Sequence, residues 1–537
     1  MTITGNLIDI DSKTIFKAIV EIEAGKIKSI SETDGKVDDQ FILPGFVDAH
    51  VHIESSMLVP TEFARMAVVH GTVATVSDPH EIGNVLGVDG VEFMIENGNK
   101  SPFKFYFGAP SCVPATTFET AGAEIDVEDV EYLLSKPEIV YLAEMMNWPG
   151  VLNGDKTVFD KITAAKKHNK PIDGHAPGLM GDMAKNYIAA GISTDHECFT
   201  KEEAQGKLDH GMWIQIREGS AAKNFEALAD LIHDNWERMM FCSDDKHPDS
   251  LLEGHLNLLV KRALAKGLDL FKVLQVACVN PVKHYKLDVG LLQVGDKADF
   301  ITIDNPTDFN IIGTYINGQL LAESGESKLL HQTCDHPNKF NIEAIDKSQL
   351  QVKSSSSSIA VIEALDGELI TNRLDLSPTL DDNLIISDVQ NDILKIIVVN
   401  RYKKVAPAVS FIKNFGLNKG ALASSVSHDS HNIVAVGVSD EDITNAINLV
   451  IENKGGLSAV DGVHNNFIPL PIAGLMTDED GYKVAEQYTL LDRQVKEMGS
   501  TLGSPFMTLS FMALLVIPKL KLSDLGLFDG EKFEFTS

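Results

Sequence analysis

The sequence predicts an α/β fold: a (β/α)8 TIM-like barrel, a small β-domain built from the segments that flank it, and a C-terminal α/β domain. Three observations lead to this prediction. Eight apolar runs alternate with helical stretches, most of the runs end in a charged or imidazole side chain, and two segments of alternating β pattern enclose them. The runs are residues 45–52, 73–80, 103–108, 139–144, 171–175, 192–196, 212–217 and 239–244.

The chain is long enough for several domains, because 537 residues exceed what one hydrophobic core normally serves. Residues 160–169 and 224–235 have the length and periodicity of helices that connect barrel strands. A run of five serines at 354–358 marks a change of character and suits a connection between domains. The predicted domains are 1–43 plus 286–340 for the small β-domain, 44–285 for the barrel, and 341–537 for the C-terminal domain.

The composition and charge of the chain limit which binding partners and which cellular compartment we expect. A formal net charge of -31 and a pI near 4.9 predict an acidic surface, which repels nucleic-acid backbones and anionic lipid. The five scattered cysteines form no C-x-x-C pair, so we expect free thiols and a cytoplasmic protein. The chain start lacks the pattern of a secretory signal. The most apolar stretch, 506–517, is shorter than the roughly 20 residues of a spanning helix, so it is expected to be buried core.

Five of the eight runs end in side chains that are candidate metal ligands. His50 and His52 lie two residues apart in an extended segment, so both imidazoles point to the same face. The carboxyl ends of barrel strands meet at one face, which is where barrel enzymes place their chemistry. The sequence therefore predicts a catalytic metal site at this face, with mixed imidazole and carboxylate ligands that favour Zn, Fe or Mn over Ca or Mg. The candidate ligands are His50, His52, Glu144, His175, His196 and Asp244.

The residue types also suggest roles. A bridging carboxylate at Glu144 could hold two ions, and Asp244 could bind metal while it takes a proton from water. Any one of these residues alone is more often a surface or structural side chain. Together, at the ends of five predicted strands of one barrel, they indicate a metal-dependent hydrolase.

Several longer motifs make a resemblance specific. The chain resembles the adenine deaminases of bacteria and archaea, a branch of the amidohydrolase superfamily, along the whole barrel and into the C-terminal domain. The matching stretches include 44–57 (PGFVDAHVHIESSM), 78–87 (DPHEIGNVLG), 142–150 (LAEMMNWPG), 173–178 (DGHAPG), 216–221 (IREGSA), 242–245 (CSDD), 427–432 (SHDSHN) and 470–474 (LPIAG).

This resemblance implies the hydrolytic deamination of adenine to hypoxanthine and ammonia, a step of purine salvage. It places the six candidate ligands around a binuclear divalent centre, with Mn or Fe favoured and Zn as a further option. In such a mechanism activated water attacks C6 of the purine while a carboxylic acid protonates a ring nitrogen. Asp244 then carries the water proton toward the departing amine, and Glu144 is a ligand, a proton donor or both.

Substrate contacts are expected from three further places. His80 and Glu81 follow the second run, Arg217 and Glu218 follow the seventh, and His431 lies in the polar cluster 428–432. The alternatives are an ion pair or helix cap for the two pairs, and a separate metal site or a polar turn for the cluster.

Two other functions compete with this interpretation. A cyclic-amide hydrolase of the dihydroorotase or hydantoinase type uses the same barrel, but it usually has a carboxylated lysine on the fourth strand, where this chain has Glu144. A non-catalytic amidohydrolase-like scaffold would lack several ligands, whereas all six candidates are present. A homo-oligomer, most simply a dimer, is expected on general frequency.

Overall fold

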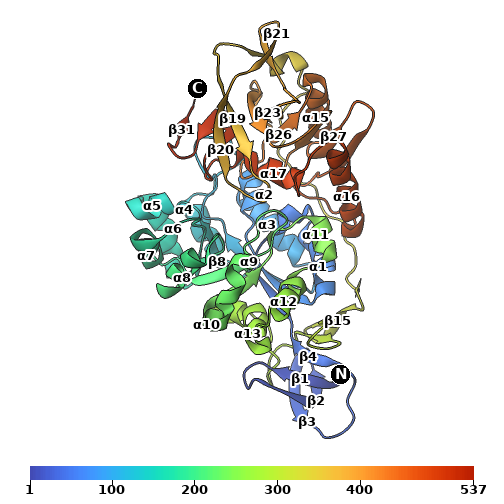
Figure 1. Ribbon diagram of the computed structural model, residues 1–537. Coiled ribbons are helices and arrows are strands. Elements are labelled where there is room, and N and C mark those ends of the chain that lie inside the picture. The colour runs from blue at the N-terminus through green and yellow to red at the C-terminus, as the bar shows by residue number, and fades with distance from the viewer. Residues whose placement is uncertain (537) are drawn as a thin grey trace.

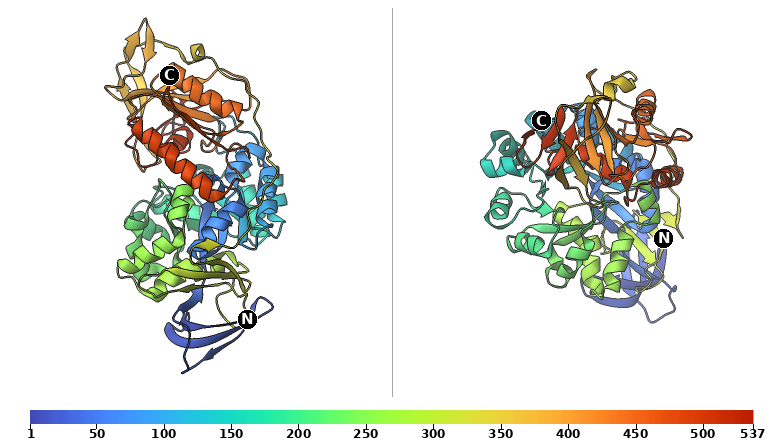
Figure 2. Two further views of the ribbon diagram at one scale, coloured as in Figure 1. Left: turned by 90° about the vertical axis from the view of Figure 1, so that its right-hand side faces the viewer. Right: turned by 45° about the horizontal axis from the view of Figure 1, so that its top comes forward.

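The computed structural model describes residues 1–536 as three parts stacked along one long axis (Figure 1). The N-terminal strands form a sheet at one end, the barrel lies in the middle, and the C-terminal domain covers the opposite end of the barrel. The side view in Figure 2 shows the same order of the three parts along this axis.

The middle part is a parallel barrel in which consecutive strands are neighbours. Its two sheets have the orders β13-β5-β6-β7-β8-β9 and β10-β11-β12. Parallel pairing of β13 with β5 closes one seam, and the Ser193 amide donates to the Ile172 carbonyl at 2.8 Å across the other. The strands are β5 (Phe46–His52), β6 (Thr72–Ser77), β7 (Lys104–Ala109), β8 (Ile139–Met145), β9 (Ile172–Gly174), β10 (Thr194–Asp195), β11 (Trp213–Arg217), β12 (Met239–Cys242) and β13 (Asp244–Asp245).

Helices surround this barrel and bury one face each against the strands. Their starts are set by local capping, as at Asp155 and Thr200, whose side chains accept backbone N–H groups of the first turn. The helices are α1 (Pro60–Ala67), α2 (His80–Leu86), α3 (Val88–Gly98), α4 (Val127–Leu134), α5 (Trp148–Asn153), α6 (Lys156–Lys167), α7 (Gly181–Ala189), α8 (Lys201–Asp209), α9 (Phe225–Leu228), α10 (Ile232–Asn235), α11 (Pro248–Glu253), α12 (Leu256–Ala265), α13 (Leu270–Leu274) and α14 (Asn280–Tyr285).

Several predicted elements differ from the structure; the run 239–244, for example, is divided into β12 and β13. The run 73–80 ends as a strand at Ser77, and His80 begins α2, because the Asp78 carboxylate accepts the His80 amide and turns the chain. The predicted helix 224–235 is broken into α9, a 3-10 turn and α10. His80 therefore projects from a helix start and not from a strand end.

The strands that precede and follow the barrel form one sheet, as the fold class predicted. Its order is β17-β16-β15-β14-β4-β1-β2-β3, and β14 pairs antiparallel with β4. The strands are β1 (Thr2–Asp9), β2 (Thr14–Glu23), β3 (Lys26–Glu32), β4 (Phe41–Pro44), β14 (Phe300–Ile303), β15 (Ile311–Ile316), β16 (Gln319–Glu323) and β17 (Glu326–Ser327).

The C-terminal domain is an α/β unit around an eight-stranded sheet of order β20-β19-β24-β23-β26-β25-β27-β28. Its helices are α15 (Asp440–Glu452), α16 (Gly481–Glu497) and α17 (Pro505–Ser510). The strands are β18 (Val352–Lys353), β19 (Ile359–Ala364), β20 (Thr371–Leu376), β21 (Thr379–Asp381), β22 (Leu384–Ile386), β23 (Ile393–Val399), β24 (Ala408–Lys413), β25 (Ala421–Ser424), β26 (Ile433–Gly437), β27 (Gly456–Val460), β28 (Asn465–Pro469), β29 (Leu520–Ser523), β30 (Gly526–Asp529) and β31 (Glu534–Phe535).

The apolar stretch 506–517 is mostly buried, and it lies on the side of the C-terminal domain that faces the barrel (Figure 1). Within residues 1–536, no helix is both long and apolar enough to cross a membrane. The predicted fold class is confirmed: a barrel, a β-sheet from its flanking segments, and a C-terminal α/β domain.

A close backbone approach connects the end of the barrel to the small sheet. An alanine Cβ at Gly290 would lie 1.8 Å from the Lys297 carbonyl oxygen, which cannot rotate away. We expect Gly290→Ala to lower the free energy of unfolding by about 1–3 kcal/mol, the usual cost of overpacking. Circular dichroism during thermal unfolding measures the effect as a lower midpoint.

Gly206→Ala in α8 is the matched control. Apart from the adjacent residues and the backbone of the helix itself, no atom of residues 1–536 lies within 4 Å of the added carbon. This change should stabilise the helix by about 0.5–1 kcal/mol. Equal unfolding midpoints for the two variants would contradict the close approach at Gly290.

Candidate metal centre

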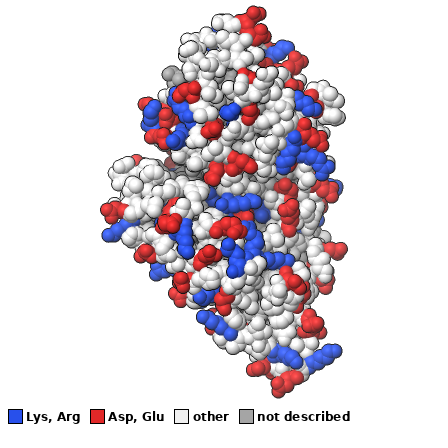
Figure 3. Space-filling view, in the orientation of Figure 1, with Lys and Arg blue, Asp and Glu red and all other residues white. Residues whose placement is uncertain are grey.

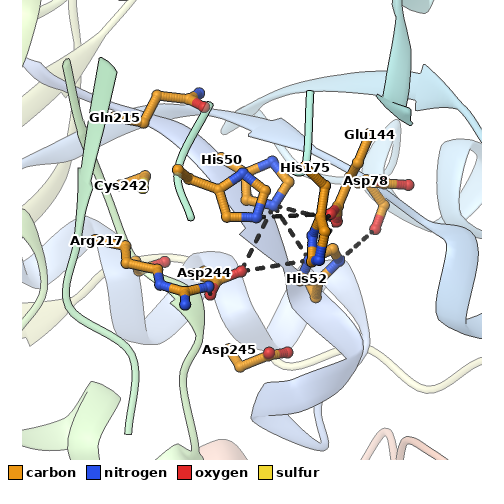
Figure 4. Close-up of polar contacts among 12 residues, drawn as sticks. His50, His52, Asp78, Glu144, His175, Gln215, Arg217, Cys242, Asp244 and Asp245 are labelled. Carbon is orange, nitrogen blue, oxygen red and sulfur yellow. Dashed lines mark hydrogen bonds and ion pairs between the residues drawn. The ribbon is translucent and has the colours of Figure 1, made fainter. Parts of the chain in front are cut away.

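The six predicted ligands come together at the carboxyl ends of the barrel strands, and Figure 4 labels all of them except His196. His50 and His52 lie on β5, Glu144 on β8 and Asp244 on β13, while His175 and His196 directly follow β9 and β10. All six residues are between 0 and 8% exposed. The fold therefore brings four imidazoles and two carboxylates, distant in sequence, into one buried cluster.

The Glu144 carboxylate joins two groups of ligand atoms. Its Oε1 lies 3.4 Å from His50 Nε2 and 3.0 Å from His52 Nε2, and Asp244 Oδ1 lies 3.5 and 3.4 Å from the same two nitrogens. Its Oε2 lies 2.7 Å from His175 Nδ1 and 3.5 Å from His196 Nε2. One oxygen thus faces each group, which is the arrangement of a bridging ligand.

The donor set fits a pair of divalent ions. Burial alone would raise the pKa of Glu144, but His196 and a hydrogen bond from His175 outweigh it and hold this pKa well below its usual range. Burial is likewise outweighed at Asp244, chiefly by Arg217, so its pKa is also well below the usual range. Ionised carboxylates are the form that binds metal. Among the described residues, Glu144 Oε1 has no hydrogen-bond partner, as expected of an oxygen that serves an ion.

Contacts outside the cluster orient the ligands. His52 Nδ1 lies 3.1 Å from the Asp78 carbonyl, which leaves Nε2 as the candidate ligand atom. The rings of His50 and His196 stack with centroids 4.1 Å apart. Asp244 has a φ of 54°, a left-handed conformation that costs a non-glycine residue about 1–3 kcal/mol and accompanies the break between β12 and β13. Such strain is typical of side chains held in place for function.

Asp48 braces the seam between the first and last strands, and the sequence reasoning did not single it out. Its Oδ1 accepts the amides of His50 at 3.3 Å and Ser243 at 3.0 Å, and His255 Nε2 lies 2.9 Å from its Oδ2. One buried carboxylate therefore positions the backbone at His50 and beside Asp244.

A sequence signal for such braces exists. Asp48, Asp78 and Asp195 each accept the backbone amide of the residue two positions later, at 3.3, 3.1 and 2.8 Å. This short-range contact lies within β5 and at the ends of β6 and β10, in each case just before a candidate ligand or a pocket residue. The Asp-x-His pattern at the first two of these strands could have revealed it.

Arg217 is placed at the cavity, but its guanidinium is already engaged. NH2 donates to Glu197 Oε2 at 2.8 Å, and NH1 donates to the other Glu197 oxygen and to Asp244 Oδ2, the latter at 2.8 Å. Arg217 helps to lower the pKa of Glu197 to about 2 against the effect of burial. The structure thus gives Arg217 the role of orienting Asp244. Glu218 pairs with Arg262 and is not among the residues that line the cavity.

Glu81 is held by the C-terminal domain. His428 Nδ1 and His431 Nε2, from the loop between β25 and β26, each contact one oxygen of its carboxylate. His428 lines the cavity together with Asp429, whereas His431 lies behind Glu81 and outside the lining. His80 also lines the cavity, and its Nδ1 lies 3.2 Å from Asp78 Oδ2.

The remaining wall of the cavity is an apolar roof. We use this term for Leu369, Phe511, Leu514 and Val516 of the C-terminal domain, which lie opposite the ligand cluster, with Met146 contributed by the barrel. The space left between roof and barrel is about 30 Å³. A volume of this size corresponds to about two waters.

Comparison with known proteins identifies relatives over the whole chain. Residues 41–321 match the amidohydrolase family, and residues 368–534 match the adenine deaminase C-terminal domain. A protein named adenine deaminase from Sulfurovum sp. (strain NBC37-1) is 55% identical over 538 residues, covering 100% of this chain and 99% of the relative. Proteins of the same name are 52% identical in Salinibacter ruber and 49% identical in Methanosarcina mazei, each covering 99% of this chain and 98% of the relative.

Asp48 offers a test of how the centre is held. We expect Asp48→Asn to weaken metal affinity about 10–100-fold, the usual effect of losing a residue that orients ligands. Competition with a coloured chelator measures this affinity. Asp304→Asn is the control, since Asp304 accepts similar backbone hydrogen bonds in the small β-sheet. Unchanged metal affinity in Asp48→Asn would show that Asp48 does not position the metal-binding residues.

Proposed function

The chain belongs to the adenine deaminases of the amidohydrolase family, and from this premise we propose that its barrel holds a binuclear divalent centre. The protein is an enzyme, and its reaction is the hydrolytic deamination of adenine. The observation that carries the proposal is the Glu144 carboxylate, which places one oxygen in each of two ligand groups. The proposed ligands are His50, His52, Glu144, His175, His196 and Asp244.

We propose Mn or Fe as the ions, with Zn as a further option, because imidazole and carboxylate ligands are mixed in both groups. When bound, such ions lower the pKa of water enough to provide hydroxide near neutral pH. The protein's part is to fix the ligands, to exclude bulk water beneath the roof, and to handle protons.

Asp244 is the proposed proton carrier. Its Oδ1 faces the ligand histidines, while its Oδ2 accepts from Arg217, so the carboxylate is fixed at the edge of the cluster and ionised. An ionised carboxylate in this place can take a proton from water and deliver it to the departing amine. Glu144 has both oxygens turned to imidazoles, which favours a role as ligand over that of ring-nitrogen acid.

The lining of the cavity suits a purine base, which has apolar faces and a polar edge. We propose that the roof packs against a face of the ring, while His80 and Glu81 contact its edge. Arg217 and His431 then act through other residues, since they orient Asp244 and Glu81 respectively. Glu218 is left out of the proposed site because Arg262 engages it.

The cyclic-amide alternative remains a useful comparison for an assay. Purified, metal-replete protein is offered adenine, adenosine, cytosine and dihydroorotate, with ammonia release and elemental analysis measured in parallel. We expect ammonia from adenine, about two ions per chain, and no opening of dihydroorotate. Turnover of dihydroorotate with no ammonia from adenine would favour the alternative.

We propose a cytoplasmic homodimer that binds neither nucleic acid nor membrane. The five cysteines are free thiols, which suits a reducing compartment. Figure 3 shows acidic and basic side chains interspersed on one face, without the continuous basic surface that nucleic-acid binding uses. The dimer rests on general frequency alone, and sedimentation of the purified protein tests it.

Asp244→Asn tests the proton carrier. The amide keeps the size of the side chain but cannot accept the proton, so kcat should fall about 10²–10⁴-fold, the range of general acid and base catalysis. Metal content, measured by elemental analysis, separates this effect from ligand loss. A variant that retains its ions and a near-normal kcat would contradict the role.

His431→Ala tests the contact between the domains. With one of its two imidazoles removed, Glu81 loses its fixed orientation, and we expect most activity on adenine to be lost while the barrel metals stay bound. His464→Ala is a control on an exposed histidine of the same domain. Unchanged kinetics for His431→Ala would exclude this histidine from the site.

A further inference from the structure

The roof is built from two segments that are far apart in sequence. Leu369 lies in the loop between β19 and β20, whereas Phe511, Leu514 and Val516 follow α17. Lys521, on β29, lies behind both segments and is 0% exposed. Its Nζ lies 2.6 Å from the Leu369 carbonyl oxygen and 2.9 Å from the Phe511 carbonyl oxygen. A single amine thus connects the two parts of the roof.

We propose that Lys521 is a positioning residue that holds the two roof segments at the spacing an adenine ring requires. The inference rests on the proposed function in one respect, that the base binds between the roof and the ligand cluster. Lys521 itself does not line the cavity, so its action on substrate is transmitted by Leu369 and Phe511.

The chemistry of the amine supports a connecting role. No ion pair joins Lys521 to a carboxylate of residues 1–536, and burial lowers its pKa to about 7. A neutral amine has two N–H donors, which match the two carbonyl acceptors, and an ammonium group can make the same two bonds. An apolar side chain here would leave two buried carbonyls unpaired, which is costly.

Hydrogen bonds from Thr371 hold the loop that carries Leu369 next to Lys521. The Thr371 hydroxyl donates to the Leu520 carbonyl at 2.8 Å, and the Thr371 amide donates to the Pro518 carbonyl at 3.0 Å. The loop that carries Leu369 is therefore docked on the strand that carries Lys521. The Lys521 amine extends this unit to Phe511 on the other side.

Phe511 connects the roof to a residue of the barrel through His428. Its ring stacks on His428, with centroids 4.7 Å apart and planes 18° apart, and His428 contacts the Glu81 carboxylate. The position of the roof therefore bears on barrel residues that line the cavity, because Phe511, His428 and Glu81 all belong to its lining. Lys521 makes the two segments move as one body.

Lys521→Met tests the proposal, because methionine is apolar and of similar length. The variant should raise KM for adenine about tenfold, on the order of one lost hydrogen bond, with kcat changed less than about threefold. Bound metal should be unchanged, since the six ligands are untouched. The Ki of hypoxanthine as a competitive inhibitor should rise by a similar factor.

Lys395→Met is the matched control. Lys395 is 2% exposed, lies on β23 and donates to the Leu350 carbonyl at 3.1 Å and to Asp440 at 2.6 Å, away from the cavity. The Lys395→Met variant should unfold at a lower temperature, while its KM for adenine stays unchanged. A normal KM in folded Lys521→Met, or the same rise in Lys395→Met, would reduce Lys521 to a structural role and overturn the proposal. The activity and metal content of the wild-type enzyme test the proposed metal centre independently of the role of Lys521.

A measurement on the unaltered enzyme does not depend on the folding of a variant. Hydrogen exchange is followed by mass spectrometry with and without hypoxanthine. We expect residues 368–371 and 509–516 to gain protection together, because one amine joins them. Protection confined to barrel loops, or to one roof segment alone, would overturn the proposal.

Discussion

The Glu144 carboxylate is the contact on which the site depends. It comes from β8 and reaches imidazoles that are carried by β5 and by the turns after β9 and β10. Burying one carboxylate and four imidazoles is expensive unless opposite charges or metal ions compensate them. The barrel permits this burial because it directs strand ends from distant parts of the chain at one point.

The charged residues around this cluster contact one another and the cluster in a defined series. Asp48 holds the backbone at the seam between β5 and the last strand, Arg217 holds Asp244, and Glu197 balances Arg217. Asp48, Arg217, Asp244 and Glu197 are all buried, and each has a partner of complementary chemistry, so none of these four is an isolated charge. This explains why the region is both polar and rigid enough to fix ligands.

The C-terminal domain completes the cavity. It covers the barrel mouth with apolar side chains and supplies the two histidines that hold Glu81. The barrel therefore provides the charged floor, and the domain provides a wall suited to the faces of an aromatic base. Neither part forms the cavity without the other, which links the stability of the domain contact to substrate binding.

Much of the site could be predicted from the sequence because strand geometry is local. Alternation along β5 puts His50 and His52 on one face, and an apolar run that ends in a ligand marks a barrel strand. The roles of Arg217 and His431 could not be predicted, because their partners lie 27 and 350 residues away. The barrel, its candidate ligands and the fold class could be predicted from the sequence alone. Which polar groups face the cavity and which support them became visible only in the folded protein. That distinction depends on packing between segments, and their separation in sequence does not reveal how close they lie in space.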